Sequence, residues 1–153
     1  MWVPPEDKDP ILYMAPTRKS ISLFGAVRLS EGKLVTQFEK TFNAITFQSF
    51  LLRLLRHRKK GKKLIALLDN AKYHHAKVLQ PFLTDHRETL HLEFLPPYSP
   101  ELNPIERVWK LTRKLCTHDT YFEKLEPLTN AVAQQHSLWS KPNGTLRKLC
   151  CII

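Results

Sequence analysis

Two acidic residues, Asp69 and Glu106, stand where carboxylates can act together. Asp69 directly follows the apolar run 64–68, and Glu106 comes 37 positions later (106 − 69), at the start of a segment with a helical pattern. A carboxylate at the end of a buried strand is costly unless it binds a cation. Two such carboxylates could hold hard divalent cations against a phosphate, as two-metal phosphoryl transfer requires. The pair therefore predicts a metal site for phosphate chemistry.

Each acid also has a structural explanation. Asp69 precedes a segment of helical composition, and Asp is a common N-cap. Glu106 lies three residues after Asn103, a position from which a glutamate can reach back to the N-cap amide. Taken alone, the segment around Glu106 favours capping over catalysis. The pairing of one acid at a strand end with another at a helix start favours a shared cation.

Hydrophobic periodicity predicts an α/β domain whose elements would position these acids. Residues 1–19 are rich in proline and are expected to be irregular, with no central strand. The run 64–68 is apolar throughout, which predicts a parallel strand buried on both faces, and ligands bind at the carboxyl ends of such strands. The full set of expected elements is a hairpin of strands 20–29 and 33–38 around the turn 30–32, a helix from the N-cap Asn43 to about Arg58, the strand 64–68, a helical segment 71–85 interrupted at Pro81, a strand 91–95, a helix from the N-cap Asn103 with Pro104 in its first position to about Leu115, and a last helix 123–139.

The composition excludes several classes of protein. The 153 residues are one domain's length and carry 24 Lys and Arg against 14 Asp and Glu, a formal net charge of +10. No apolar run could cross a bilayer, the first residues do not resemble a signal peptide, and three cysteines make no disulfide framework. We therefore expect an intracellular protein in a reducing compartment whose partner is a polyanion, most simply nucleic acid.

A cluster of cations follows the first expected helix. It can be a solvated loop that complements the helix C-terminus or a patch that contacts DNA phosphates, and the sequence favours neither. The candidate DNA-binding residues are Arg58, Lys59, Lys60, Lys62 and Lys63.

Two longer motifs resemble those of a known family. From Leu68 to His74 the sequence reads LDNAKYH, similar to an aliphatic residue followed by D-N-A-x-x-H. From Phe94 to Trp109 it reads FLPPYSPELNPIERVW, which resembles the block L-P-P-Y-S-P-x-L-N-P-I-E-x-x-W almost letter for letter. Both motifs are hallmarks of the DDE transposases of the mariner-like superfamily, in its bacterial insertion-sequence branch. The resemblance extends over nearly the whole chain.

This resemblance implies a fold, a cofactor and a reaction. The implied fold is a ribonuclease H-like mixed sheet with flanking helices, and the implied cofactor is Mg²⁺ (or Mn²⁺) held by three carboxylates. The implied reaction is DNA cleavage at transposon ends, followed by attack of the freed 3′-hydroxyl on target DNA. Asp69 matches the second acid and Glu106 the last, so both become catalytic metal ligands. Positioning rather than reactive roles are implied for Asn70, His74, Tyr98, Asn103 and Trp109.

The family's first acid, and the middle strand that carries it, have no counterpart in this sequence. That strand precedes the hairpin, and the only acids before residue 20 are Glu6, Asp7 and Asp9, in the proline-rich stretch. Without a middle strand, the inner edges of the hairpin and of the strand 64–68 would expose unpaired backbone groups. We therefore expect the isolated chain to depend on a partner and to be inactive.

The expected organisation is a partial catalytic domain over residues 1–153, with no N-terminal helix-turn-helix region. It divides into an irregular segment 1–19, a core 20–140 and a tail 141–153. The expected partners are DNA, at transposon ends and target, and an upstream transposase polypeptide or a second copy of the chain, with no membrane. The expected location is the cytoplasm of a bacterium, at the nucleoid. The alternative functions are a non-catalytic DNA-binding remnant of a transposase and an expression accident without function.

Overall fold

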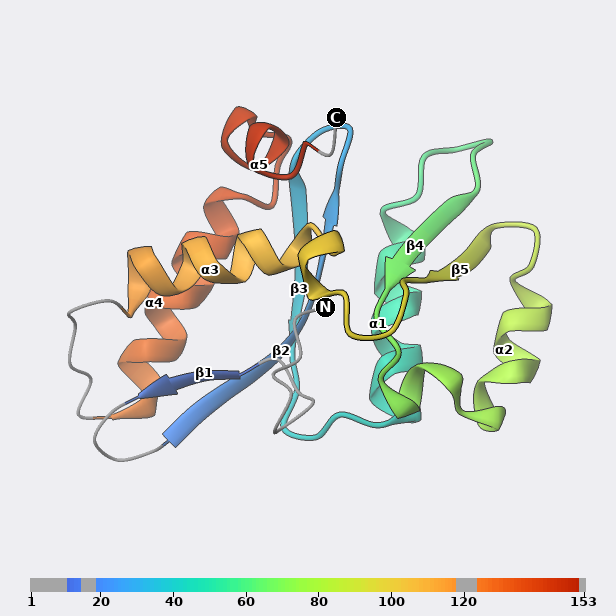
Figure 1. The fold of residues 1–153 in the computed structure, drawn as a ribbon, viewed down its shortest axis with the longest axis horizontal. Coiled ribbons are helices and arrows are strands. Elements are labelled where there is room, and N and C mark those ends of the chain that lie inside the picture. Colours follow the sequence, from blue (N-terminus) through green and yellow to red (C-terminus); the bar gives the residue numbers. More distant parts are fainter. Residues whose placement is uncertain (1–10, 15–18, 118–123, 152–153) are drawn as a thin grey trace. The chain divides into compact units, whose positions relative to one another are not determined.

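The computed structural model describes residues 11–14, 19–117 and 124–151. The chain forms two compact units (Figure 1). Unit 1 combines residues 1–40 with residues 104–153, and unit 2 spans residues 41–103. The expected core 20–140 is therefore divided between two units.

Unit 1 contains an antiparallel sheet in the order β1–β2–β3. Its strands are β1 (Ile11–Met14), β2 (Lys19–Arg28) and β3 (Lys33–Phe38). The pairing of β2 with β3 confirms the predicted hairpin. The prediction that residues 1–19 are irregular is wrong at β1, which pairs with the start of β2. The proline argument still holds in part, because β1 lies at the edge of the described sheet, where fewer ladder hydrogen bonds are needed.

The described part of unit 1 also contains the helices α3 (Ile105–Cys116), α4 (Leu125–Leu138) and α5 (Gly144–Leu149). α3 begins one residue later than predicted, because Pro104 rather than Asn103 is its N-cap. α4 confirms the predicted last helix, although residues 118–123 lie outside the described part. α3 and α4 pack on each other and on β2. The side chains at the centre of this core are Ile21, Leu23, Leu34, Ile105, Val108, Trp109, Leu128, Val132, Trp139 and Leu146.

The indole of Trp109 packs α3 closely against the backbone of β2. Its side chain is buried in the core of unit 1. A Cβ atom added to Gly25 of β2 would lie only 2.4 Å from Cη2 of Trp109, well inside van der Waals contact. Glycine is therefore the residue that lets the indole lie on the strand.

α5 closes the end of the hairpin, in a region expected only to be a tail. Asn143 caps the helix by accepting a hydrogen bond from the backbone N–H of Leu146 at 2.8 Å. Its Nδ2 donates to the carbonyl oxygen of Gly32 at 2.7 Å, and its backbone N–H donates to that of Glu31 at 3.0 Å. The cap of α5 is thus also its attachment to the β2–β3 turn. An asparagine shortly before an apolar residue is the sequence signal that could have predicted this helix.

Unit 2 contains a parallel pair of strands and several helical elements. These are α1 (Ala44–Arg56), β4 (Leu64–Leu68), the 3₁₀ turns η1 (Lys72–His75) and η2 (Lys77–Leu79), α2 (Gln80–Asp85), β5 (Leu90–Phe94) and the 3₁₀ turn η3 (Pro100–Leu102). The predicted N-cap of α1 is confirmed, since Oδ1 of Asn43 accepts from the backbone N–H of Thr46 at 2.9 Å. In return, Oγ1 of Thr46 accepts from the backbone N–H of Asn43 at 3.0 Å. This reciprocal capping box satisfies two amides that the helix itself leaves unpaired.

β4 and β5 pair in parallel, as predicted, with Leu68 opposite Phe94. Their carboxyl ends therefore meet at one edge of the sheet. The prediction that β4 is buried on both faces is wrong, because 63% of Ile65 and 40% of Leu67 is exposed. Alternate residues of a strand point to opposite faces, and no described element covers the face that bears these two side chains.

The segment between β4 and β5 is less helical than predicted. The backbone is extended at Ala76 (ψ 135°), which separates η1 from η2 and prevents one continuous helix. Pro81 does not interrupt a helix but lies in the first turn of α2. Proline is favoured there because its missing N–H has no helical partner to lose.

Within the described residues, the two sheets share no strand. β4 has β5 as its one strand neighbour in that part of the chain, so its other edge carries backbone groups without a strand partner. None of the helices described above is both long and apolar enough to span a bilayer.

Candidate active site

Asp69 lies at the carboxyl edge of the β4–β5 pair, directly after Leu68. Its side chain is 28% exposed. Oδ1 accepts a hydrogen bond from the backbone N–H of Ala71 at 3.2 Å and lies 3.1 Å from Nδ1 of His74. Oδ2 receives no hydrogen bond from the described residues. The carboxylate is therefore anchored through one oxygen and presents the other.

His74 holds this residue from the interior of unit 2. Its Nδ1 lies 2.9 Å from the backbone oxygen of Asp69, in addition to its contact with Oδ1. A carbonyl oxygen can only accept, so Nδ1 carries the ring proton and Nε2 is bare in the neutral ring. The ring packs against Phe47 and Tyr73, with centroid distances of 4.5 and 4.6 Å. These contacts keep the imidazole in the orientation that the hydrogen bonds require.

The charge states of this pair favour a cation ligand. Burial lowers the pKa of His74 more than its bond to Asp69 raises it, so the ring is neutral near pH 7. Burial raises the pKa of Asp69, but the hydrogen bonds from His74 and Ala71 are among the interactions that outweigh it and bring the pKa below its ordinary value. The carboxylate is thus ionised at neutral pH, as a metal ligand must be.

Asn70 joins the ends of the two strands. Its Nδ2 donates to the carbonyl oxygen of Leu95 at 2.7 Å, and its Oδ1 accepts from Nε2 of His75 at 3.1 Å. The backbone N–H of Leu95 donates to the carbonyl of Leu68 at 2.8 Å. The amide of Asn70 therefore fixes the start of the proline-rich loop beside Asp69.

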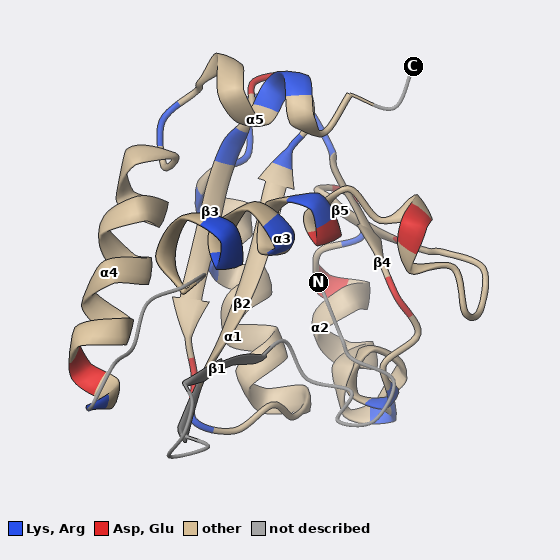
Figure 2. Ribbon diagram, turned by 60° about the vertical axis from the view of Figure 1, so that its left-hand side comes forward, with Lys and Arg blue, Asp and Glu red and all other residues tan. Residues whose placement is uncertain are grey.

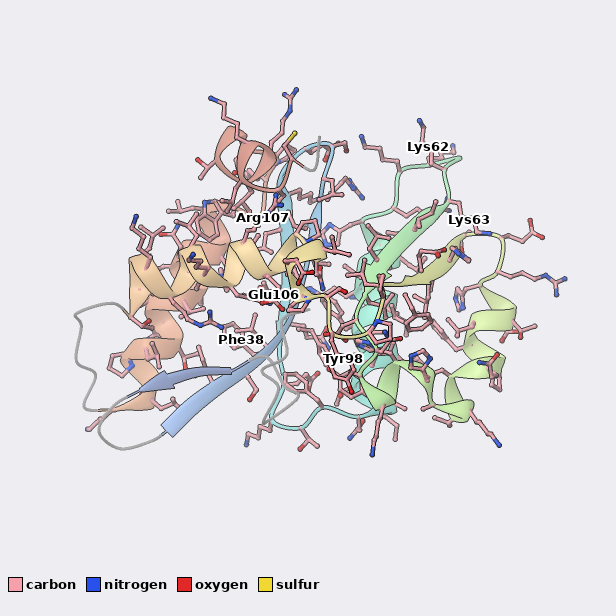
Figure 3. The ribbon with its side chains drawn as sticks, in the orientation of Figure 1. Phe38, Lys62, Lys63, Tyr98, Glu106 and Arg107 are labelled. Carbon is pink, nitrogen blue, oxygen red and sulfur yellow. The ribbon has the colours of Figure 1, made fainter. Side chains whose placement is uncertain are left out.

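The loop 96–103 after β5 exposes one motif residue and buries another. Tyr98 is fully exposed and has a positive φ of 56°, which is rare for a residue with a large side chain (Figure 3). Asn103 is buried, and its backbone N–H donates to the carbonyl of Pro100 at 3.0 Å at the end of η3. Tyr98 is thus fully open to solvent, whereas Asn103 is part of the fold.

Glu106 lies in the first turn of α3, in unit 1 (Figure 3). Backbone N–H groups point out of this end of a helix and favour a carboxylate. Burial lowers the pKa of Arg113, and the charge of Glu106 opposes that shift. The two residues are seven apart, which places them on the same side of α3, two turns from each other.

Arg107, next to Glu106, is a residue that the sequence did not single out. Its Nη1 donates to the carbonyl oxygens of Leu149 at 3.1 Å and Cys151 at 3.0 Å. It therefore ties the end of α5 to the first turn of α3. Figure 2 shows Lys and Arg residues on both of these helices. Arg107 occupies a variable position of its motif, and its acceptors are backbone carbonyls, so no sequence signal indicated the contact.

Asp69 and Glu106 belong to different units. The convergence of their carboxylates on one metal site therefore stays a prediction. In the part of the chain that the structure describes, no three His, Cys, Asp or Glu residues form a group that could hold a metal ion.

The basic loop 57–63 between α1 and β4 is closed by one of its own cations. Nη1 of Arg58 donates to the carbonyl of Lys62 at 2.7 Å, and the backbone N–H of Lys62 donates to that of Lys59 at 3.1 Å. Arg58 is thus committed to shaping the loop, and its predicted contact with DNA remains untested. The exposed lysines of the loop are Lys59, Lys60, Lys62 and Lys63, of which Figure 3 labels the last two.

The sequence profile of the DDE superfamily endonucleases matches residues 1–129. The chain belongs to this family. The uncharacterized protein y4pE/y4sA of Sinorhizobium fredii is 29% identical to this DDE endonuclease chain over 121 residues, which cover 78% of the chain and 86% of the relative. The family expected from the two motifs is thereby confirmed.

Solved structures share the fold of this DDE superfamily endonuclease. The catalytic domain of Mos1 mariner transposase matches with a TM-score of 0.69 at 20% identity, over 94% of this chain and 72% of that one. The Mos1 strand transfer complex matches with a TM-score of 0.63 at 21% identity, over 98% of this chain and 44% of that one. A simian T-cell lymphotropic virus intasome in complex with PP2A regulatory subunit B56 gamma matches with a TM-score of 0.59 at 18% identity, over 80% of this chain and 44% of that one. The chain thus spans less than half of the matched chains in the last two. These likenesses confirm the predicted ribonuclease H-like α/β fold.

Proposed function

We propose that this chain supplies Asp69 and Glu106 to the active site of a DNA transposase, which cuts DNA at transposon ends and joins the freed 3′-hydroxyl to target DNA. The observation that carries the proposal is the state of Asp69. Its carboxylate is ionised, anchored through Oδ1 by His74 and Ala71, and presents Oδ2 at the carboxyl edge of a parallel strand pair. Ligands bind at that edge in α/β sheets.

The donor chemistry of these residues fits Mg²⁺ or Mn²⁺. Both ions prefer carboxylate oxygens, and Asp69 offers one that no described residue occupies. Glu106 would contribute a second carboxylate from the first turn of α3. When bound, the ions supply Lewis acidity and a nucleophile for phosphoryl transfer. In the proposed site Asp69 and Glu106 hold the ions, His74 orients Asp69, and Asn70 fixes the adjoining loop.

We propose that a second polypeptide completes the site. Two carboxylates from one chain leave each ion with few anchors, and β4 has an edge without a strand neighbour in the described residues. Beside that edge, Ile65 and Leu67 expose apolar surface that a further strand or its helix could cover. An upstream transposase polypeptide that carries a strand and a third acid fits this need, and a second copy of the chain is the other candidate.

The proposed substrate is double-stranded DNA. The net charge of +10 and the exposed lysines of the loop 57–63 favour a polyanion. The similar structures include a strand transfer complex and an intasome, which supports the same class of partner. A bacterial protein with this activity would work at the nucleoid.

The test is a cleavage assay with the purified chain. A labelled duplex that carries a transposon end is incubated with Mg²⁺ or Mn²⁺, with the chain alone and with an upstream polypeptide added. We expect cleavage only in the mixture, and we expect Asp69→Asn and Glu106→Gln to abolish it. Glu88→Gln is the matched control, because Glu88 is an exposed acid of unit 2 that precedes β5, whereas Asp69 lies at the opposite, carboxyl end of the strand pair. Glutamine caps a helix as well as glutamate does, so loss of activity in Glu106→Gln would separate catalysis from capping.

A non-catalytic DNA-binding remnant is the second candidate. The observation that favours it is that no three His, Cys, Asp or Glu among the described residues form a group that could hold a metal ion. This function predicts DNA binding with no cleavage in either reaction. Cleavage by the chain alone would contradict both candidates in their present form, since the chain would then hold a third ligand of its own.

A further inference from the structure

Unit 2 contains a cavity of about 330 Å³ whose lining includes neither of the two proposed metal-binding acids. It lies among η1, α2 and β5, with an apolar lining that includes Leu83, Leu92 and Phe94. Lys63 and Arg87 are part of its lining and are exposed on the surface. Its volume falls at the small end of the range for ligand sites, which is about 300–1,000 Å³. The space suits one small molecule with an apolar body and a charged group.

The two cations that line the cavity have no acidic partner in its lining. The lining contains Lys63 and Arg87 but no Asp or Glu. Neither cation forms a side-chain hydrogen bond or ion pair with the described residues. Two acids adjoin lining residues in the sequence, namely Glu88 beside Arg87 and Glu93 between Leu92 and Phe94. Glu88 is exposed and pairs with neither cation, and Glu93 contacts His91 at 2.9 Å. Arginine and lysine without carboxylate partners at a concave site favour a phosphate or carboxylate group.

One wall of the cavity is aromatic and held in place. The ring of His75 stacks on Phe94, with centroids 4.1 Å apart and planes inclined by 24°. The same ring donates through Nε2 to Oδ1 of Asn70, which fixes its orientation. A rigid wall of this kind binds a planar ring with little loss of side-chain entropy.

His74 links the cavity to the candidate active site. It lines the cavity and contacts Asp69 through Nδ1, while its buried Nε2 has no hydrogen-bond partner in the described part of the chain. A buried acceptor without a donor is unusual in a folded protein.

We propose that this cavity binds an aromatic phosphate monoester of the size of a nucleoside 5′-monophosphate. The phosphate pairs with Lys63 and Arg87, and the ring lies in the apolar part beside Phe94. The lining includes neither Asp69 nor Glu106, so the proposal stands whether or not the chain belongs to an active transposase.

The experiment uses the full chain and three probes, namely thymidine 5′-monophosphate, thymidine and inorganic phosphate. Binding is followed by NMR on the methyl groups of Leu83 and Leu92. We expect the nucleotide to bind about tenfold or more tightly than either half, because both the apolar and the charged parts must contribute. Equal affinity for nucleotide and inorganic phosphate, or shifts confined to other residues, would overturn the proposal.

Paired variants test the role of charge. The double substitution Lys63→Gln and Arg87→Gln should weaken nucleotide binding by about tenfold or more, since each charge-assisted hydrogen bond contributes to affinity. Both residues are exposed, so the fold should be unaffected. The matched control is Arg53→Gln with Lys77→Gln, two exposed cations of unit 2 outside the cavity, which should bind as the native chain does. The same loss of affinity in both double variants would show only a general charge effect and would refute the site.

Discussion

Nδ1 of His74 lies 3.1 Å from Oδ1 of Asp69 and 2.9 Å from its backbone oxygen, so one imidazole holds both the side chain and the main chain of the residue that follows β4. The ring is buried and neutral, and both acceptors belong to the same residue. This geometry limits the rotation of the carboxylate while leaving Oδ2 uncovered. It gives an acid at the end of a strand a fixed direction, which is what a metal ligand would require.

Replacing His74 with phenylalanine should raise the pKa of Asp69. The ring volume and the contact with Phe47 are kept, but the hydrogen bond that stabilises the ionised carboxylate is lost. A carboxyl group whose pKa is lower in the folded state than in the unfolded state stabilises the fold at pH values above its unfolded pKa, and this stability is lost as pH falls. In the variant the two pKa values are closer, so the free energy of unfolding should fall less on acidification. The measurement is an NMR titration of the Asp69 carboxyl carbon.

The matched control for this titration is His86→Phe. His86 is a histidine of the same unit whose Nδ1 contacts the carbonyl of Phe82 and not Asp69. The pKa of Asp69 should be unchanged there. An unchanged pKa in His74→Phe as well would mean that burial and the Ala71 amide alone set the charge state of Asp69.

Unit 1 should lose stability on acidification because of His136. Burial lowers the pKa of this residue to about 4. Its Nε2 lies 3.1 Å from Oγ1 of Thr112, which donates its own proton to Val108 at 2.8 Å, so Nε2 is the donor. A second proton would have to go to Nδ1, which is buried and has no partner among the described residues. The folded state therefore resists protonation.

The unfolded chain binds this proton at its ordinary pKa of about 6.5, so the free energy of unfolding should fall as pH drops from about 6.5 to about 4, by on the order of 3 kcal/mol. Urea unfolding followed by the NMR signals of α3 and α4 measures this slope. His136→Leu should flatten it, and Thr112 would keep its bond to Val108. An equal slope in the variant would assign the acid sensitivity to another group.

Gly32→Ala should detach α5 from the hairpin. Gly32 has φ +71°, and an added Cβ atom would lie 2.4 Å from the backbone oxygen of Asn143 and from the backbone nitrogen of Arg147. A left-handed backbone costs a residue with a Cβ atom about 1–2 kcal/mol, and the overlap with backbone atoms adds to this. Amide hydrogen exchange in α5 should accelerate strongly.

Gly61→Ala is the control that isolates the steric part. Gly61 has a similar φ of +76°, but nothing lies within 4 Å of an added Cβ atom. Its substitution should lower the free energy of unfolding of unit 2 only by the cost of a left-handed backbone, about 1–2 kcal/mol. Equal destabilisation at both positions would contradict the close contact between the turn and Asn143.

DNA binding by the chain should weaken steeply with salt and should depend on the basic loop. Replacing Lys60 and Lys62 with glutamine should reduce the slope of log affinity against log salt by about 2, since each phosphate contact contributes about 1. Filter binding over a range of salt concentrations measures the slope. Lys114→Gln with Lys148→Gln, two exposed lysines of unit 1, is the control and should retain it. An unchanged slope in the loop variant would assign the loop to solvation alone.

Local signals were enough to predict several elements. The cap at Asn43, the β2–β3 hairpin and the strand that ends before Asp69 each depend on residues close together in the sequence. Capping, turn formation and periodicity are short-range effects, so a few neighbouring residue types determine them. The motifs around Asp69 and Glu106 identified the family for the same reason, since each is a continuous stretch of chain.

Contacts between distant segments were decided by the tertiary structure. Arg107 donates to backbone carbonyls at the end of α5, and Gly32 lies close to the backbone oxygen of Asn143. Both contacts involve backbone atoms, which no side-chain type in the sequence indicates. The exposure of Ile65 depends on which face of β4 is covered, which apolar composition cannot specify. The sequence determined the chemical groups and their local elements, because these arise from side-chain type and short-range periodicity. The tertiary structure decided which nitrogen of His74 faces Asp69 and which helix end Arg107 holds, because such contacts require atoms from separate segments to come within hydrogen-bond distance.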